Sequence, residues 1–171
     1  MHNSLPRLSL AAHAIAVFSL GIMAGFFATY AINVSLAMLS FDGPTYAMVQ
    51  SAFNRHVRHT LFFVFFFGPT LWCLLAVVGR WMEHRQGWWR LTAVTGVAYA
   101  LGIVTFTHEV HLPLNALTES WMPSHMPEDG VLTRDSWNRA NNFRAWFSAA
   151  LFALGLGSLV QRMSAAARGS T

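Results

Sequence analysis

Four histidines stand in two pairs with helical spacing, and imidazole is a side chain that can bind metal ions or transfer protons. His56 and His59 are three residues apart, and so are His108 and His111. Residues three apart on an α-helix share a face, so each pair can present two imidazoles in one direction. Two such pairs at the same depth on neighbouring helices can bind one metal ion, and imidazole suits copper, zinc, iron and nickel. The spacing predicts a metal site, with proton relay, substrate hydrogen bonding and anchoring at a membrane interface as alternative interpretations.

Further polar side chains accompany these pairs. Asn115 lies seven residues after His108 and continues the same helical stripe. Glu109 is about 100° around the helix from His108, where it can orient an imidazole or hold an arginine. Asn141 and Arg144 share a face by their spacing, and an arginine within a membrane needs a partner. We expect Glu109 to be that partner, either in a structural ion pair or beside a bound substrate.

The elements that must position these residues are four apolar segments. The chain has 171 residues, of which 54% are hydrophobic and 11% charged, whereas a soluble domain carries about a quarter charged residues. A helix needs about 20 predominantly apolar residues to span the hydrocarbon core of a bilayer. Because the gaps between the segments are short, we predict one all-α domain over residues 1–171, a membrane-spanning antiparallel four-helix bundle. The predicted spans are approximately residues 10–39, 57–80, 88–113 and 137–162.

In such a bundle the end of the first span, the start of the second, the end of the third and the start of the fourth meet at one membrane face. All the candidate site residues lie at those places, so we expect one polar site at one depth. The residues from Tyr46 to Val57 have amphipathic helical spacing and predict an interfacial helix or an early extension of the second span. Pro113 is expected to kink or end the third helix, and Thr133 or Asp135 to cap the fourth.

The distribution of charge weakly indicates how the chain is oriented in the membrane, and it excludes nucleic acid as a partner. The basic residues are all arginines and form no water-facing cluster, which excludes nucleic acid binding. Six lie on the side of the two termini, namely Arg7, Arg80, Arg85, Arg90, Arg162 and Arg168. Five lie on the other side, namely Arg55, Arg58, Arg134, Arg139 and Arg144. The arginines of the short loop 80–90 favour cytoplasmic termini in a bacterial inner membrane, with the site toward the periplasm.

Five short motifs occur in an order that carries a family resemblance. They are Ala24-Gly25-Phe26-Phe27-Ala28, Asn54-Arg55, Phe66-Phe67-Gly68, Val110-His111-Leu112-Pro113-Leu114-Asn115 and Trp137-x-x-x-Asn141-x-x-Arg144. Together they resemble the anthrone oxygenase family of small four-span membrane proteins. The resemblance implies a four-helix membrane bundle and, for characterised fungal members, oxidation of a polycyclic anthrone to an anthraquinone with molecular oxygen. The resemblance also implies that Asn115, Trp137, Asn141 and Arg144 are functional positions.

The chain departs from the family pattern in its histidines, since members commonly have asparagine at the position of His111 and lack His56 and His59. The extra imidazoles favour a metal-dependent variant. We therefore predict a membrane-bound oxidoreductase that oxidises a hydrophobic, aromatic type of substrate with molecular oxygen. Copper is the preferred metal because the ligands are nitrogens on an oxidising side of the membrane, and non-haem iron and haem are the alternatives.

A non-enzymatic role is the alternative prediction. The chain would then bind a metal or haem, or would be an accessory subunit of a larger membrane complex. Gly21 and Gly25 form a small-residue stripe that lets another helix approach closely, which suits either packing within the bundle or assembly. The sequence leaves open whether the chain acts alone, as a homo-oligomer or within such a complex.

Overall fold

The regular elements of the protein are all helical. The computed structural model describes residues 4–168, with side chains described from residue 7 onward. The α-helices are α1 (Ser4–Thr29), α2 (Ser35–Met38), α3 (Gly43–His56), α4 (Thr60–Val78), α5 (Gly87–Tyr99), α6 (Leu112–Glu119) and α7 (Gly130–Arg168). Three π-helical segments, η1 (Tyr30–Val34), η3 (Ala100–Thr105) and η4 (Thr107–His111), and the 3-10 turn η2 (Trp81–Glu83) lie between them.

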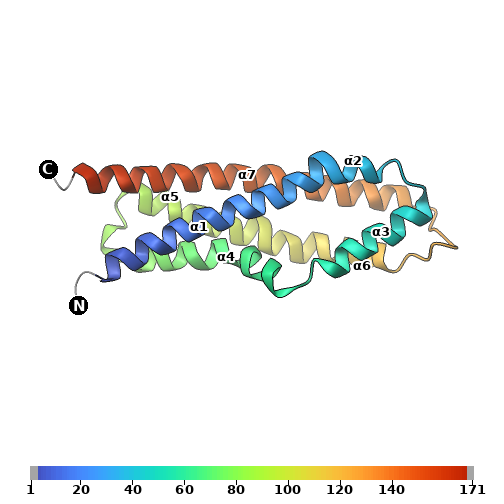
Figure 1. Ribbon diagram of the computed structural model, residues 1–171, viewed down its shortest axis with the longest axis horizontal. Coiled ribbons are helices and arrows are strands. Elements are labelled where there is room, and N and C mark those ends of the chain that lie inside the picture. Colours follow the sequence, from blue (N-terminus) through green and yellow to red (C-terminus); the bar gives the residue numbers. More distant parts are fainter. Residues whose placement is uncertain (1–3, 169–171) are drawn as a thin grey trace.

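These elements form four rods that are long and apolar enough to cross a membrane. The rods are Arg7–Met38, Thr60–Val78, Gly87–Glu119 and Gly130–Arg168. They run side by side along the long axis (Figure 1). The start of α1 and the end of α7 lie at the same end of the bundle. The predicted fold class is confirmed, and the second span is confined to α4 because α3 is a separate helix.

The helix α3 is separated from both neighbouring spans by short non-helical segments. At its start the Asp42 carboxylate accepts a hydrogen bond from Thr45 N at 2.9 Å. Hydrogen bonding to Thr45 lowers the pKa of Asp42, so this cap is lost as the pH falls through that lowered pKa. At the other end the chain turns after His56, and His59 Nδ1 caps α4 by accepting from Phe62 N at 3.3 Å. A separate helix after Asp42 is therefore found, rather than an early extension of the second span, and its place at the membrane interface stays a prediction.

The fourth span begins earlier than its sequence suggested. The predicted caps Thr133 and Asp135 lie inside α7, which starts at Gly130, so that prediction was wrong. A turn closed by Gly130 N and Pro127 O at 3.1 Å leads into the helix, and Thr133 N then bonds to Asp129 O. Arg144 consequently lies about four turns from the start of the helix, well inside the span.

Pro113 does not interrupt the third span. Because proline lacks an N–H, it is best tolerated in the first turn of a helix, and Pro113 occupies that place in α6. The turns before it are the π-helical segments η3 and η4, whose wider i→i+5 bonding changes the direction in which side chains point. Such segments occur frequently at functional sites.

The core and the glycines show where helices come close. The buried core cluster consists of Leu20, Met23, Phe27, Phe66, Tyr99, Ile103, Ala145 and Leu151. A Cβ added at Gly155 of α7 would lie 2.9 Å from Leu20 of α1, and one at Gly21 would lie 3.0 Å from Phe152. Nothing lies within 4 Å of such an atom at Gly25. The packing role expected of Gly21 fits this contact, while the same expectation for Gly25 was wrong.

Candidate active site

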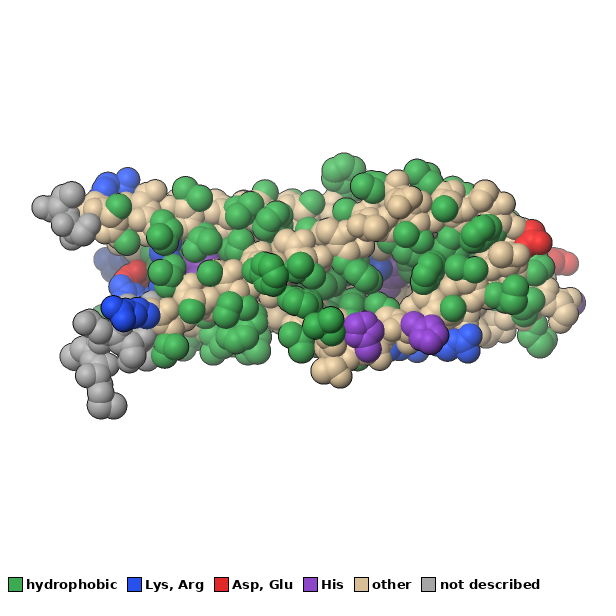
Figure 2. Space-filling model, in the orientation of Figure 1, with side chains coloured by type: hydrophobic (Ala, Val, Ile, Leu, Met, Phe, Trp, Pro, Cys, Tyr) green, Lys and Arg blue, Asp and Glu red, His purple; other side chains and the backbone are tan. Residues whose placement is uncertain are grey.

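A cavity of about 850 Å³ lies between the spans, toward the end of the bundle that holds α3 and α6. Figure 2 shows one face of the molecule, where apolar side chains surround a hollow in the surface between the rods. Seven phenylalanines line the cavity, namely Phe26, Phe27, Phe53, Phe62, Phe63, Phe66 and Phe67. Its polar lining residues include Tyr30, Gln50, Asn54, Arg58, Thr107, His108, Glu109, Asn115, Asn141 and Arg144, with Trp137 beside them.

The phenylalanines of α4 form an ordered apolar wall. Residues four apart on a helix lie one above the other, which places Phe62 over Phe66 and Phe63 over Phe67. The first pair is stacked with ring centroids 5.3 Å apart and an interplanar angle of 22°, and the second with values of 6.2 Å and 20°. The two pairs meet edge-on, at 65° between Phe62 and Phe63 and 79° between Phe66 and Phe67. Such a wall suits a flat aromatic ligand, because aromatic rings prefer offset-stacked or edge contacts.

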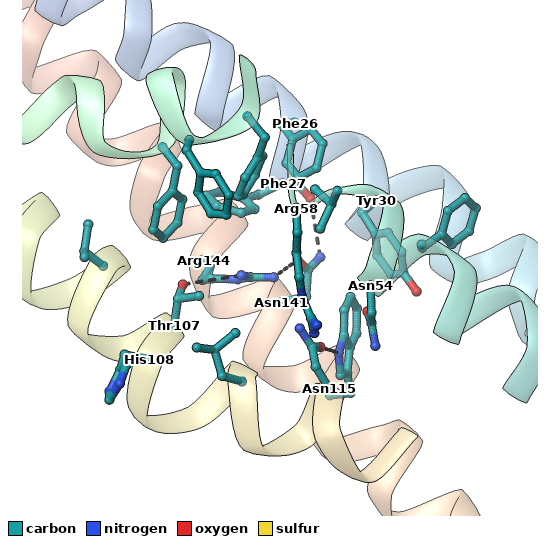
Figure 3. Close-up of a pocket in the computed structure, with 18 of the residues that line it drawn as sticks. Phe26, Phe27, Tyr30, Asn54, Arg58, Thr107, His108, Asn115, Asn141 and Arg144 are labelled. Carbon is teal, nitrogen blue, oxygen red and sulfur yellow. Dashed lines mark hydrogen bonds between the residues drawn. The ribbon is translucent and has the colours of Figure 1, made fainter. Parts of the chain in front are cut away.

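Opposite this apolar wall lies the guanidinium of Arg144, which is buried (Figure 3). Arg144 Nη2 donates to Asn141 Oδ1 at 2.9 Å, and Nη1 donates to Thr107 Oγ1 at 3.4 Å. The Cζ atom lies 4.5 Å from the centroid of the Phe27 ring, close enough for a cation–π interaction. Asn141 is held in turn by a hydrogen bond from its Nδ2 to Phe27 O at 3.4 Å. Arg144 and Asn141, predicted as site residues, therefore do meet.

Arg144 has no carboxylate partner among the described residues. The expected pair with Glu109 is absent, because Glu109 Oε1 instead pairs with His108 Nδ1 at 2.8 Å. Both of those side chains are largely exposed, whereas the guanidinium is buried. Arg144 Nε also makes no hydrogen bond. The positive charge thus faces an apolar cavity with only neutral partners, and a buried charge in that state gains stability when an anion binds beside it.

Asn115 and Trp137 form a second polar pair in the lining. Trp137 Nε1 donates to Asn115 Oδ1 at 2.7 Å, and the Trp137 ring lies 4.6 Å from that of Tyr30 between centroids. Within the described part of the chain Asn115 Nδ2 has no hydrogen-bond partner, so it is available to donate to a ligand. Two of the four positions implied by the family resemblance, Asn115 and Trp137, therefore contact each other at the cavity.

A chain of hydrogen bonds closes the cavity on the side of α3, and sequence reasoning did not assign it to the site. Tyr30 OH donates to Gln50 Oε1 at 2.5 Å, Gln50 Nε2 to Asn54 Oδ1 at 2.8 Å, and Asn54 Nδ2 to Thr118 Oγ1 at 3.0 Å. Gln50, Asn54 and Thr118 are buried. A sequence signal existed, because Gln50 and Asn54 lie four apart on an amphipathic helix and so share a face.

The four histidines predicted to bind a metal do not come together. His56 ends α3 and His59 precedes α4, so a bend in the backbone separates them and both are exposed. His108 is exposed while His111 is buried, since the π-helical turns of η4 send residues three apart to different sides. Within residues 4–168 no group of three or more histidine, cysteine, aspartate or glutamate side chains has a geometry that can hold a metal ion. The four imidazoles therefore do not form a ligand set for one metal ion. The metal ion itself stays a prediction, without the histidine cluster that suggested it.

His111 is nevertheless part of the site's surroundings. Its ring meets that of Trp137 edge-on at 4.9 Å between centroids and that of Phe106 at 6.4 Å. Only 1% of the residue is exposed, and neither ring nitrogen makes a hydrogen bond of standard geometry, although the backbone of Ala140 lies close by. His111 therefore supports the Trp137 ring by packing.

Comparison with known proteins gives one match. A protein-family model described as Anthrone oxygenase matches residues 61–154, more than half of the chain. The matched segment contains α4, the third span and the part of α7 that holds Trp137, Asn141 and Arg144. Searches of curated proteins and of solved structures gave no match.

Proposed function

Because the chain belongs to the anthrone oxygenase family, we propose that it is a membrane-bound oxygenase that oxidises a flat, hydrophobic aromatic substrate with molecular oxygen. The observation that carries this proposal is the buried guanidinium of Arg144, which lacks a counter-ion among the described residues and faces a cavity walled by phenylalanines. Such a cavity suits a ligand that is apolar over most of its surface and carries one oxygen that becomes negative during the reaction.

The body of the substrate is expected to lie against the stacked rings of α4. Ligand pockets typically measure roughly 300 to 1,000 Å³ and are mostly apolar with a few well-placed polar groups. The cavity, at about 850 Å³, falls within that range and has this composition. Six of its seven phenylalanines come from α1 and α4, two of the rods that are apolar enough to face lipid. A substrate dissolved in the bilayer can therefore reach them without passing through water.

The role proposed for Arg144 is to stabilise the oxygen of a deprotonated substrate. An anthrone has a methylene group in conjugation with an aromatic ketone, and loss of a methylene proton gives an enolate with its charge largely on oxygen. A fixed cation in a site of low dielectric stabilises such a charge far more than it would in water. Asn141 and Thr107 hold the guanidinium in place, so little reorganisation is needed when the charge forms.

The overall reaction balances without an external reductant. The electron-rich enolate carbon is attacked by molecular oxygen, the methylene group loses two hydrogens, and one oxygen atom becomes the new carbonyl. The second oxygen atom leaves with the two hydrogens as water. The proposal routes no step through a metal ion, because the predicted imidazole ligands do not form a set. The unpaired donor of Asn115 is available to orient the substrate oxygen or the attacking oxygen molecule.

The direct test is oxidation of anthrone by the detergent-purified protein. We expect oxygen uptake to equal anthraquinone formation, at a rate well above that in the same detergent without protein. Arg139→Gln is a matched control, because Arg139 lies on the same helix, is exposed and bonds only locally to Ser136 among the described residues. A rate equal to the protein-free rate would contradict the proposal, and so would equal losses in Arg144→Gln and Arg139→Gln.

A further inference from the structure

A second cavity, of about 430 Å³, lies at the opposite end of the bundle. It is formed where the start of α1 and the end of α7 meet the loop between α4 and α5. Three arginines line it, Arg7, Arg80 and Arg162, together with Glu83 as the one carboxylate of its described lining. The cavity is separate from the proposed active site and plays no part in the reaction described above.

The charges in this cavity do not cancel. Glu83 forms an ion pair with Arg80, which is the neighbour three residues before it. Neither Arg7 nor Arg162 has a carboxylate partner among residues 4–168. Two positive charges therefore remain uncompensated in a concave site, where low-dielectric walls focus the potential and favour an anion.

Arg162 forms a rigid wall of the cavity. Its Nη1 donates to Ser9 O at 3.0 Å and its Nη2 to Ser9 Oγ at 2.9 Å, while Cζ lies 4.2 Å from the centroid of the Trp88 ring. Only 9% of Arg162 and 3% of Trp88 is exposed. Ser9 is fixed in its turn by a hydrogen bond from its Oγ to Ala76 O at 2.8 Å. A guanidinium held this firmly loses little conformational freedom when a ligand binds, which favours affinity.

We infer that this cavity binds a phosphate-bearing anion, and that its source is the headgroup of an anionic lipid. The planar fork of arginine matches the geometry of phosphate oxygens and can bond to two of them at once. The cavity lies level with the end of α4 at Val78 and the start of α5 at Gly87, which is where a bilayer has its headgroups. Leu10 and Met163 add apolar lining for the lipid's glycerol and upper acyl chains. Basic pockets between membrane helices commonly hold anionic headgroups.

The test is a binding titration on the full-length protein in neutral detergent. Three probes are compared, namely phosphatidylglycerol, diacylglycerol with the same acyl chains, and inorganic phosphate, each added at constant ionic strength. Native mass spectrometry and the melting temperature report binding. We expect phosphatidylglycerol to bind and to raise the melting temperature, with diacylglycerol having little effect because it lacks the phosphate.

Arg7→Gln is the informative variant, since Arg7 is exposed and makes no contact that holds the fold among the described residues. It should weaken phosphatidylglycerol binding about fivefold, the effect of one arginine at a membrane surface. Arg85→Gln is the control, because Arg85 is an exposed arginine at the same end of the bundle, in the loop between α4 and α5, and does not line the cavity. Arg162→Gln should weaken binding more, but it also removes two hydrogen bonds to α1.

The possible outcomes test two claims separately: that the cavity binds a phosphate group, and that this phosphate belongs to a lipid. Inorganic phosphate that binds as well as the lipid would overturn the lipid assignment. Equal binding of diacylglycerol and phosphatidylglycerol would overturn the phosphate site itself. Equal weakening by Arg7→Gln and Arg85→Gln would do the same, because it would reduce the effect to general surface charge.

Discussion

Each end of the bundle holds a buried arginine over an aromatic ring, yet the two arginines are satisfied to different degrees. Arg162 lies over Trp88, and its two terminal nitrogens each bond to Ser9 at 3.0 Å or less. Arg144 lies over Phe27, bonds to Asn141 at 2.9 Å, and has a long contact of 3.4 Å to Thr107 and an unbonded Nε. Both terminal nitrogens of the first arginine are fixed to Ser9, whereas the second has one short hydrogen bond and an Nε without a partner among the described residues.

His13 and His111, the buried histidines of residues 7–168, also differ in how well they are satisfied. His13 Nε2 lies 2.8 Å from Ser158 Oγ and 3.2 Å from Thr92 Oγ1, and its ring stacks on Trp88. His111 packs against Trp137, and neither of its ring nitrogens makes a hydrogen bond of standard geometry within the described residues. Buried polar groups are usually satisfied. His13 has one ring nitrogen, Nδ1, without a hydrogen bond, whereas both ring nitrogens of His111 lack one of standard geometry. The contrast between the two arginines supports the proposal that the reaction takes place at the end with α3 and α6.

Arg144→Gln is expected to have the largest effect on activity. Loss of one preorganised charge at a developing oxyanion should lower the kcat for anthrone oxidation by roughly a hundredfold to a thousandfold. Arg162→Gln should instead lower the melting temperature, since its side chain makes two hydrogen bonds that join α7 to α1. Steady-state kinetics and thermal melts on both variants measure this difference. Equal loss of kcat in the two variants would break the comparison.

Replacing each buried histidine with leucine tests the second difference. His13→Leu removes hydrogen bonds to Ser158 and Thr92 and should cost about 1 to 2 kcal/mol of unfolding free energy. His111→Leu removes no hydrogen bond of standard geometry within the described residues and should leave stability equal or higher, because a poorly satisfied buried polar group is replaced by an apolar one. Denaturation in detergent measures both values. A larger loss of unfolding free energy for His111→Leu than for His13→Leu would show that His111 makes a stabilising polar contact, which would contradict this prediction.

Trp137→Phe should have a smaller effect on catalysis. It keeps the aromatic contact with Tyr30 but removes the Nε1 hydrogen bond that orients Asn115. The expected change is about a fivefold loss of kcat/KM, equivalent to about 1 kcal/mol. Trp146→Phe is the matched control, because Trp146 lies on the same helix with 77% of its surface exposed. Unchanged kinetics for Trp137→Phe would remove Asn115 from the proposed site.

The exposed histidines should have the smallest effect of all. His56→Ala and His59→Asn are expected to leave activity and bound metal unchanged, because both side chains are on the surface and asparagine preserves the cap at the start of α4. Elemental analysis of the purified variants measures the metal. A loss of stoichiometric copper or iron in either variant would restore the metal site predicted from the sequence.

Much of the fold could be predicted because length and apolarity decide which segments cross a bilayer. The four spans, the separate helix before α4 and the meeting of Asn141 with Arg144 follow from hydropathy and regular helical spacing. The early start of α7 could not be predicted, because Asp129, Thr133 and Asp135 are all residues of a capping type and hydropathy does not choose among them.

The four histidines do not meet, and the physical reason lies in the local backbone around each pair. The i,i+3 rule assumes an unbroken α-helix, and neither pair lies on one. His56 and His59 are separated by a bend, and His108 and His111 lie on π-helical turns. Glu109 was matched with Arg144 because both lie at one end of the bundle, but position along a helix does not fix which side a residue faces.

The most direct test of the central claim is the affinity of the cavity for an anion. A flat polycyclic phenol is titrated into the purified protein at a pH above the phenol's own pKa, and its methyl ether, which cannot ionise, serves as the neutral reference. We predict that the wild-type protein binds the phenolate more tightly than the ether, and that Arg144→Gln removes this preference while still binding the ether. Equal affinity of the wild-type protein for the two ligands would contradict the role assigned to Arg144.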